Sequence, residues 1–416
     1  MDPRLISIYA SAGILLGANG LIVTLIAIRA DLEGMPDSVI GFLGAGYFFG
    51  FFASCFWTPT LIRRAGHIRV FAALAALYAI TTLSIVLWVD AAFWVAMRVV
   101  GGFCSAGIAT VIESWLNHIA DNKDRARVLS MYRVVDLTFV TAGQFMMPVI
   151  GVSGFEIFAV TAILFCLAII PVSLSRQHSP PPPDSTRLRP LATWALSPTA
   201  CIGCVIIGLT NGAFRTVGPI YAREIGLGVD DVALFVSLSI VAAAVCQYPL
   251  GAMSDRIGRR IVLLGATAVT IASSLFLFTL GRLDPIFVFI GGMLFGGFAL
   301  PLYSLSIAHA ADFAKPGEFV ELSVGLVLFY TLGAIFGPLI SSGLISNLGP
   351  AYFFAYTGAV HSILVAFILY RMTRRMAVSR SERGRFVGML RTSPLFSRMA
   401  TGRSDASEQS KKVPDS

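Results

Sequence analysis

The sequence predicts an all-α membrane protein in which twelve transmembrane helices form two six-helix bundles related by an internal repeat. Three observations predict this class: the composition, the length and number of the apolar segments, and residue matches between the two halves of the chain. Of the 416 residues, 56% are hydrophobic and 13% are charged, whereas a soluble domain has about 25% charged residues. A soluble enzyme, a disordered chain and a disulfide scaffold are therefore excluded, and most of the chain is expected to face lipid.

The apolar segments set the expected number of helices. A helix rises about 1.5 Å per residue, so about 20 apolar residues cross the roughly 30 Å hydrocarbon core of a bilayer. The first segment is too long for the hydrophobic core of a signal peptide and is expected to be the first span. We expect twelve spans, at residues 5–28, 39–62, 70–89, 91–113, 128–150, 154–174, 195–218, 231–253, 261–281, 285–308, 320–345 and 350–370.

A proline-rich stretch divides these spans into six and six. Residues 180–183 are four consecutive prolines, which favour an extended, solvated linker. The expected domains are an N-terminal six-helix bundle at 1–174, a Pro/Arg-rich cytoplasmic linker at 175–194, a C-terminal six-helix bundle at 195–371 and a basic, largely disordered cytoplasmic tail at 372–416.

The charged residues predict the orientation in the membrane. Basic residues such as Arg63 and Arg256 lie in the loops on the side of the N-terminus, whereas Asp31, Asp90 and Asp284 lie in the alternate loops. Cytoplasmic loops carry an excess of Lys and Arg, so both termini are expected to be cytoplasmic. The net charge of +8 then reflects topology and a basic tail, and no nucleic-acid partner is expected.

An internal repeat relates the two halves of the chain. Its matches keep a nearly constant offset, which chance does not explain, so we expect two bundles of the same orientation packed face to face. The matches are Asn19-Gly20 with Asn211-Gly212, Ala30 and Gly34 with Ala222 and Gly226, Arg64-Ala65-Gly66 with Arg256-Ile257-Gly258, Gly101-Gly102-Phe103 with Gly296-Gly297-Phe298, and Thr141, Gly143 and Pro148 with Thr331, Gly333 and Pro338.

One loop carries a family motif. Gly251–Arg260 (GAMSDRIGRR), between spans eight and nine, resembles the signature G-x-x-x-D-R-x-G-R-R of the major facilitator superfamily. The matching stretch between spans two and three is degraded, with Arg63 in place of the acid and His67 in place of the second loop arginine. Arg98 with Gly102 resembles the R-x-x-x-G pattern of span four, and residues 113–127 resemble the loop between spans four and five. The resemblance covers residues 5–371.

The resemblance implies a secondary active transporter that works by alternating access around a central cavity. Glu113-Ser114-Trp115-Leu116 points to a poorly characterised bacterial branch, so we expect the bacterial inner membrane. We expect a monomer in the lipid bilayer that takes up a small organic solute with protons as the coupling ion, and a vitamin-like aromatic such as riboflavin is one open substrate. Efflux of a drug or metabolite is the alternative, and a non-transporting receptor or scaffold is a remote one. Met147-Pro148, where antiporters carry Gly-Pro, favours uptake.

Three charged residues inside the spans are candidates for proton coupling. A charge at the centre of a bilayer costs about 2.5–3.5 kcal/mol on insertion scales, so each such residue is a functional candidate. Asp136 lies deepest among the acids, and Arg133 is one turn away at i−3, where the two side chains can pair. Arg98 lies in span four and is expected to point inward. A fixed ion pair that only lowers the insertion cost is the competing interpretation of Asp136 and Arg133.

Polar residues inside the spans are candidates for the substrate cavity. Amide, hydroxyl and guanidinium groups can bind a polar solute, but they can equally form hydrogen bonds between helices, and both interpretations stay open. The candidates are Asn19, Tyr47, Gln144, Asn211, Arg215, Gln247 and Tyr330.

Charged residues at the cytoplasmic ends of the spans are candidates for a gate of ion pairs. We expect Glu113 to pair with Arg64 or Arg69, and Asp255 to pair with Arg256 and Arg259, with Glu321 matching Glu113 in the second half.

No enzyme motif, cofactor or metal site is expected. The five histidines are scattered, without an H-E-x-x-H motif or a Walker lysine. Cys201-x-x-Cys204 has no second ligand pair for zinc, and all six cysteines lie in apolar segments.

Overall fold

The computed structural model describes residues 3–119, 125–174, 190–314 and 319–374, and all regular secondary structure in these ranges is helical. The helices fall into two groups along the chain. The N-terminal half contains α1 (Pro3–Leu32), α2 (Asp37–Ala65), α3 (His67–Leu87), α4 (Ala91–Ile119), α5 (Arg125–Gln144), α6 (Met146–Ile150), α7 (Glu156–Leu167) and α8 (Ile169–Ser173). The C-terminal half contains α9 (Pro190–Leu196), α10 (Pro198–Thr216), α11 (Gly218–Glu224), α12 (Val229–Ile257), α13 (Arg259–Leu280), α14 (Pro285–Ala299), α15 (Leu302–Ala311), α16 (Phe319–Leu348) and α17 (Tyr352–Arg374).

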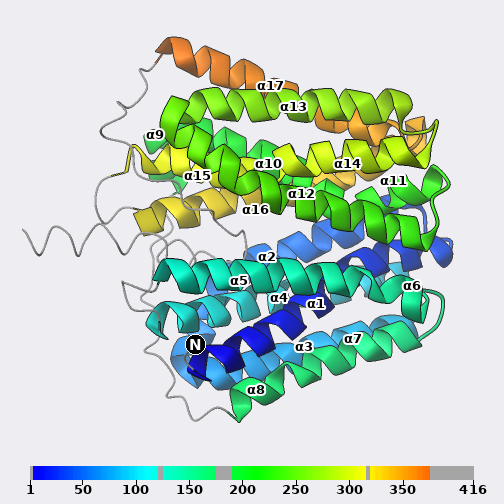
Figure 1. Ribbon diagram of the computed structural model, residues 1–416. Helices are drawn as coiled ribbons and strands as arrows, with labels where there is room; N and C mark the ends of the chain where they lie inside the picture. Colours follow the sequence, from blue (N-terminus) through cyan, green and yellow to red (C-terminus); the bar gives the residue numbers. More distant parts are fainter. Residues whose placement is uncertain (1–2, 120–124, 175–189, 315–318, 375–416) are drawn as a thin grey trace, which may run out of the picture.

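The helices run back and forth between two faces of the molecule. In Figure 1 the N-terminal half lies below the C-terminal half, and Pro3 and the end of α17 lie on the same side. We call this side, which also holds the turns at Gly66 and Gly258, the terminal face. The other side, the opposite face, holds the loops 33–36, 88–90, 151–155, 225–228, 281–284 and 349–351.

The prediction of an all-helical membrane protein with about twelve spans is confirmed. Eleven helical segments in the described ranges are long and apolar enough to cross a membrane. The predicted fifth span is the exception, because α5 carries Arg125, Arg127, Arg133 and Asp136 and is separated from α6 at Phe145. Charge and interruption lower its hydropathy, although α5 and α6 together still run from one face to the other (Figure 1).

The expected linker and tail begin or end inside helices. Residues 190–194 of the expected linker belong to α9, and residues 372–374 of the expected tail belong to α17. The remaining residues of both segments, 175–189 and 375–416, lie outside the described ranges.

Prolines explain why four of the spans are divided into two helices. A proline has no N–H to donate to the carbonyl four residues earlier, and its ring crowds that carbonyl. Each division lies shortly before a proline or next to one. The prolines are Pro148 in α6, Pro171 in α8, Pro219 in α11 and Pro301 between α14 and α15.

The backbone at the end of the first span of each half confirms the internal repeat. Gly34 has a φ of 72° and Gly226 a φ of 98°, a left-handed conformation that glycine adopts without a Cβ clash. The hydrogen bonds match as well: Gly34 N–H donates to the Asp31 carbonyl and Gly226 N–H to the Arg223 carbonyl. Matching local geometry at an offset of 192 residues means that both halves repeat one structural unit.

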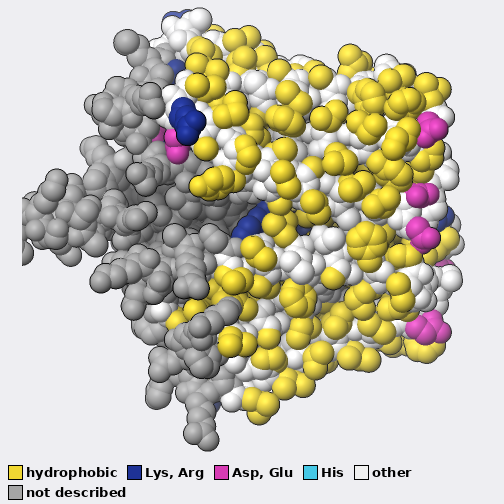
Figure 2. All heavy atoms as spheres, viewed as in Figure 1, with side chains coloured by type: hydrophobic (Ala, Val, Ile, Leu, Met, Phe, Trp, Pro, Cys, Tyr) yellow, Lys and Arg dark blue, Asp and Glu magenta, His cyan; other side chains and the backbone are white. Residues whose placement is uncertain are grey.

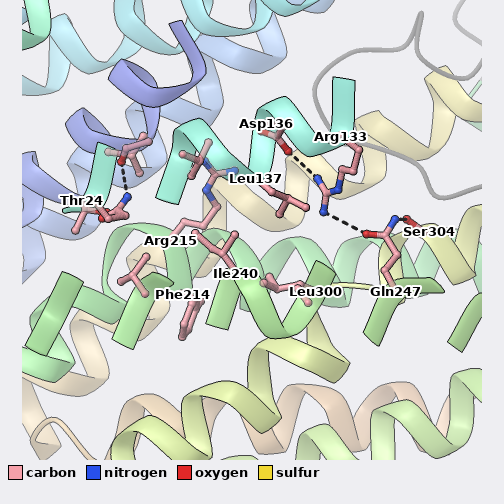
Figure 3. A pocket seen from close by; sticks show the side chains of 16 residues that line it. Thr24, Arg133, Asp136, Leu137, Phe214, Arg215, Ile240, Gln247, Leu300 and Ser304 are labelled. Carbon is pink, nitrogen blue, oxygen red and sulfur yellow. Dashed lines mark hydrogen bonds and ion pairs between the residues drawn. The ribbon is translucent and has the colours of Figure 1, made fainter. Parts of the chain in front are cut away.

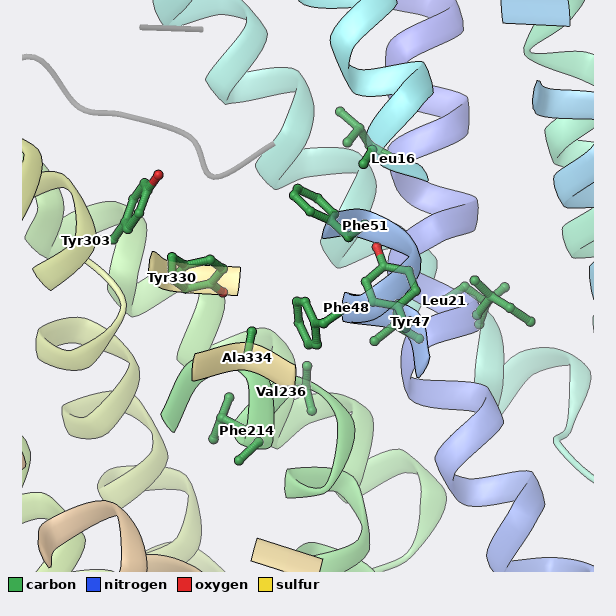
Figure 4. Close-up of a cluster of buried hydrophobic side chains, with 14 of the residues drawn as sticks. Leu16, Leu21, Tyr47, Phe48, Phe51, Phe214, Val236, Tyr303, Tyr330 and Ala334 are labelled. Carbon is green, nitrogen blue, oxygen red and sulfur yellow. The ribbon is translucent and has the colours of Figure 1, made fainter. Parts of the chain in front are cut away.

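The two halves pack against each other near the opposite face. Helix α2 packs along α16, and α1 contacts both α10 and α11. At Gly44 the approach is so close that an added Cβ would lie 2.6 Å from Thr216 Oγ1 and 2.8 Å from Pro338 Cβ. Between the halves, Phe48 and Phe51 lie on the side of α2 that faces Tyr330 and Tyr303 (Figure 4), within one buried hydrophobic cluster.

Candidate functional site

A cavity lies between the two halves. Figure 2 shows the surface hollowed between them at mid-height, with basic side chains visible in the hollow. Both halves contribute to the lining, through α1 and α5 on one side and α10, α12 and the α14–α15 junction on the other (Figure 3). The lining residues are Gly20, Val23, Thr24, Arg133, Asp136, Leu137, Val140, Gln144, Phe214, Arg215, Val236, Ile240, Ala243, Gln247, Leu300 and Ser304.

A chain of polar contacts crosses the cavity from one half to the other (Figure 3). Arg133 Nη1 lies 2.7 Å from Asp136 Oδ2, as their i, i+3 spacing on α5 predicts. Arg133 Nη2 donates to Gln247 Oε1 at 3.2 Å, and Gln247 Nε2 donates to Ser304 Oγ at 3.3 Å. The ion pair is therefore linked to α12 and α15 of the other half. A change in the charge of Asp136 would alter a contact that joins the halves.

The Arg133–Gln247 contact forms one polar end of the cavity, and Arg215 forms the other. Its side chain is exposed, and within the part of the chain that the structure describes it has neither an ion pair nor a hydrogen bond. Arg215 is the last but one residue of α10, and Pro219 removes the N–H that would otherwise bond the Arg215 carbonyl. The end of α10 thus places a guanidinium in the cavity. Gln144 is close-packed in the lining, where its Nε2 donates to the Gly20 carbonyl at 2.9 Å.

An apolar zone separates the two polar ends. Leu137 and Ile240 lie between Arg215 and the Arg133–Gln247 contact in Figure 3, and Val236 and Phe214 also line this zone. A solute that fills the cavity therefore meets hydrocarbon along its middle and polar groups at its ends.

Arg98 lies inside the N-terminal half, behind the cavity lining. Its side chain is 2% exposed, and its guanidinium carbon lies 4.5 Å from the centre of the Tyr47 ring. Asn19 Oδ1 accepts hydrogen bonds from Tyr78 at 2.8 Å and from Ser105 at 3.2 Å, and Tyr47 donates to Ser105 at 2.9 Å. Asn19 and Tyr47 thus bond other helices of their own half, which is the interhelical alternative left open by the sequence. Tyr78 and Ser105 were not among the predicted site residues.

Two further cavity candidates are buried in the C-terminal half. Asn211 is fully buried, and neither its amide nitrogen nor its oxygen has a hydrogen-bond partner in the described ranges. Tyr330 is 3% exposed and packs edge-on against Tyr303, with 5.2 Å between ring centroids. The structure therefore brings Gln144, Arg215 and Gln247 of the seven predicted residues into this cavity lining.

At the terminal face of the C-terminal half, Arg259 is the centre of an ionic cluster. Its Nη1 lies 2.5 Å from Asp255 Oδ1 and its Nε lies 3.4 Å from Asp312 Oδ2. The side chains of Arg259 and Asp312 are 3% and 4% exposed. Arg256 is exposed and, among described residues, does not join this cluster. Asp312 was not predicted, although it is the first acidic residue after the tenth span.

The predicted pairing of Glu113 with Arg64 or Arg69 differs from the structure. Glu113 is fully buried, whereas both arginines are exposed, and these three described side chains form no ion pair with one another. The physical reason is the location of the arginines at helix ends, where their side chains reach solvent. His67, at the repeat position of Arg259, is buried and its Nε2 lies 2.8 Å from Ser114 Oγ. The Glu321 side chain lies outside the described residues.

The described part of the chain has no group of three or more His, Cys, Asp or Glu side chains placed to hold a metal ion. None of the six cysteines, all of which lie in the described ranges, forms a disulfide, and Cys201 and Cys204 are buried in α10.

Two helical halves that share a cavity with polar ends are the architecture of a class of membrane transporter. A family model of the Major Facilitator Superfamily matches residues 6–198 and 200–403, and the chain belongs to this superfamily. The predicted family and fold are thereby confirmed.

Relatives and solved structures agree with this assignment. The uncharacterized MFS-type transporter YcaD of Escherichia fergusonii is 24% identical over 373 residues, covering 87% of this chain and 96% of that protein. An uncharacterized MFS-type transporter of Yersinia pestis is 24% identical over 357 residues, covering 83% and 90%. The crystal structure of the nucleoside transporter NupG aligns with a TM-score of 0.75 at 12% identity, covering 90% of this chain and 100% of that one. A bacterial homolog of the lysosomal transporter Spinster, inward-facing and occupied, aligns with a TM-score of 0.72 at 13% identity, covering 91% and 97%. At these identities the solved structures show the fold alone.

Proposed function

We propose that this protein takes up a small organic solute across the bacterial inner membrane by alternating access, coupled to protons. The observation that carries the proposal is the cavity between the halves, with an ion pair in its lining whose arginine also contacts the other half. The solute would bind in this cavity while the halves open to one side or the other.

The contacts between the halves support a conformation that is closed at the opposite face. There, Arg223 Nε donates to Asp31 Oδ2 at 2.8 Å, and Gly44 packs against Thr216 and Pro338. The hollow in Figure 2 lies towards the terminal side of these contacts. In the proposed cycle these contacts break and the hollow closes as the solute crosses.

Asp136 is the proposed proton carrier. As a carboxylate it holds Arg133 at 2.7 Å, and its side chain is 15% exposed, so water and protons have access to it. A proton on Asp136 removes the negative charge and with it the attraction to Arg133. Arg133 then interacts more freely with Gln247 or with the solute, which links protonation to the contact between the halves.

The terminal face is the proposed cytoplasmic side. Acidic residues such as Asp90, Asp230 and Asp284 lie at the opposite face, where Figure 2 shows acidic side chains, whereas Arg63, Arg64 and other arginines lie at the terminal face. This distribution supports cytoplasmic termini by the excess of positive charge on cytoplasmic loops. We propose that one copy of the chain suffices, because both walls of the cavity come from the same chain.

Flux in proteoliposomes tests the proposal. In the Asp136→Asn variant we expect loss of solute accumulation driven by an inward proton gradient, with solute exchange retained, because the neutral amide cannot bind and release a proton. Asp230→Asn, which changes an exposed acid at the opposite face, serves as the matched control. Unaltered pH dependence of transport in Asp136→Asn would exclude the proton role of this residue.

The direction of the proton gradient separates uptake from its alternative. An efflux antiporter would concentrate solute against the proton flow, whereas the proposed symporter concentrates it with the flow. A receptor or scaffold on the same fold would move no solute in either assay.

A further inference from the structure

We propose that the solute is an organic anion whose carboxylate binds Arg215; this inference rests on the proposed function and names its substrate class. It follows from the charges of the cavity, from the burial of a second arginine nearby and from the separation of the polar ends.

The charges that line the cavity do not cancel. The lining contains two arginines, Arg133 and Arg215, and one acid, Asp136. Asp136 lies 2.7 Å from Arg133, so its negative charge is balanced by the positive charge of Arg133. Arg215 is exposed to the cavity with no acidic partner in the described ranges. A guanidinium that faces a cavity at this depth is a candidate binding group, and a planar carboxylate matches its paired N–H donors.

Arg98 adds to the positive potential of this region. It is buried against Tyr47, and no acidic side chain in the described ranges pairs with it. Arg98 and Arg215 carry like charges and repel each other. An anion placed at Arg215 relieves this repulsion, whereas a cation there would add a third positive charge. The field therefore selects against amines as well as for carboxylates.

The apolar zone between the two polar ends indicates the chemistry of the rest of the solute. With its carboxylate at Arg215, the body of the molecule lies along Leu137, Ile240 and Val236 (Figure 3). Its far end reaches the Arg133–Gln247 contact, which offers hydrogen-bond donors and acceptors. An acid with an apolar or aromatic body and a hydrogen-bonding group at the far end fits this arrangement.

Matched probes test the proposal on the full chain in proteoliposomes. The probes are para-hydroxybenzoate, para-hydroxybenzamide and para-hydroxybenzylamine, which share one body and differ in the group at one end and its charge, together with hexanoate, hexanamide and hexylamine. We measure thermal stabilisation of the purified protein and counterflow of each labelled probe. We expect the carboxylate of each set to bind and exchange more strongly than its amide, and the amine to be weakest.

Variants then assign the preference to Arg215. In Arg215→Gln the advantage of carboxylate over amide should fall by about tenfold to a hundredfold, since a hydrogen bond to a charged group is lost. Arg215→Lys keeps the charge and should retain part of the preference, which shows that the cavity still forms. Arg63→Gln removes an exposed guanidinium far from the cavity and should leave the preference unchanged.

The outcomes separate this proposal from the proposed function. A preference for the amide or the amine, equal effects within each set, or no effect of any probe overturns the anion proposal. So does a carboxylate preference that survives in Arg215→Gln. Counterflow of amides or amines would still support a transporter, whereas a lack of flux for all six probes would count against transport as well.

Discussion

Asp31 and Arg223 form an ion pair of 2.8 Å between the two halves, and they occupy equivalent positions of the internal repeat, 192 residues apart. Each lies at the end of the first span of its half, just before a glycine in the left-handed conformation. Equivalent residues of two related halves meet only close to the axis that relates the halves. Two identical charges there would repel, so divergence of the repeat into an acid and an arginine turned this meeting point into an attractive contact.

Exchange of these two charges should be tolerated better than loss of either. The side chains of Arg223 and Asp31 are 25% and 32% exposed. We therefore expect Asp31→Asn or Arg223→Gln to shift the equilibrium between the conformations closed and open at the opposite face towards the open one by at most about fivefold. The double variant Asp31→Arg with Arg223→Asp should return the balance towards that of the parent chain. The measurement is labelling of Ile240→Cys in the cavity by an impermeant maleimide applied at the opposite face, corrected for labelling of the native cysteines. Labelling of the double variant that equals or exceeds the labelling of Asp31→Asn and Arg223→Gln would contradict this role.

Glu224 should make closure of the opposite face dependent on pH. It ends α11, beyond the membrane-spanning segment Pro198–Thr216. Glu224 is exposed, but partial desolvation of its carboxylate, together with the negative charges of Asp37 and Asp31, raises its pKa from 4.5 to about 7, although Arg282 acts in the other direction. The closed arrangement therefore binds the proton more tightly than an open one in which Glu224 is solvated. The stabilisation of the closed conformation by protonated Glu224 is fully present below about pH 4.5 and is lost as the pH rises to about 7.

The maleimide assay measures this dependence directly. Labelling of Ile240→Cys from the opposite face should increase from about pH 5 to about pH 7 in the parent chain, after correction for the pH dependence of thiol reactivity with a free thiol standard. In Glu224→Gln the increase should be absent, because the amide does not ionise. Asp284→Asn, at the opposite face in another loop, is the control and should keep the increase.

Gly44 should act as a point of close contact that permits closure. A methyl group there would lie within 3 Å of Thr216 and Pro338 of the other half, and overpacking of this kind costs about 1–3 kcal/mol. Gly44→Ala should therefore favour the conformation that is open at the opposite face, with more maleimide labelling. Gly343→Ala on α16 is the matched control, since a Cβ at Gly343 has no neighbour within 4 Å among the described residues. Similar labelling of both variants would argue against this contact.

The Arg259 cluster should contribute to stability more than to transport selectivity. Arg259→Gln removes the guanidinium that lies 3.4 Å from Asp312, whose side chain is 4% exposed, and removal of one partner of a buried pair costs about 3–5 kcal/mol. The double variant Arg259→Gln with Asp312→Asn should recover part of that loss. The measurement is thermal unfolding in detergent, with the exposed Arg256→Gln as a control expected within about 0.5 kcal/mol of the parent. An unfolding temperature unchanged in Arg259→Gln would show that the cluster does not stabilise the fold.

Contacts between residues near in sequence could be predicted, and those between distant residues could not. Arg133 and Asp136 are one turn apart on one helix, so their pairing follows from helix geometry, as does that of Asp255 with Arg259. The contact of Arg133 with Gln247 joins residues 114 positions apart, and no local pattern specifies it. The same limit explains why Asp312 was not predicted and why Glu113 was assigned to exposed arginines.

The sequence by itself determined the membrane class, the approximate number of spans, the repeat and the family, because hydropathy, glycine positions and a loop motif are local properties of the chain. Only the tertiary structure decided which polar residues face the cavity. Asn19 and Asn211 share one register of the repeat, yet Asn19 bonds Tyr78 and Ser105 inside its half while Arg215, one turn beyond Asn211, lines the cavity. The direction in which a polar side chain points depends on the helices that pack against it, and the packing of distant helices is set by the whole fold.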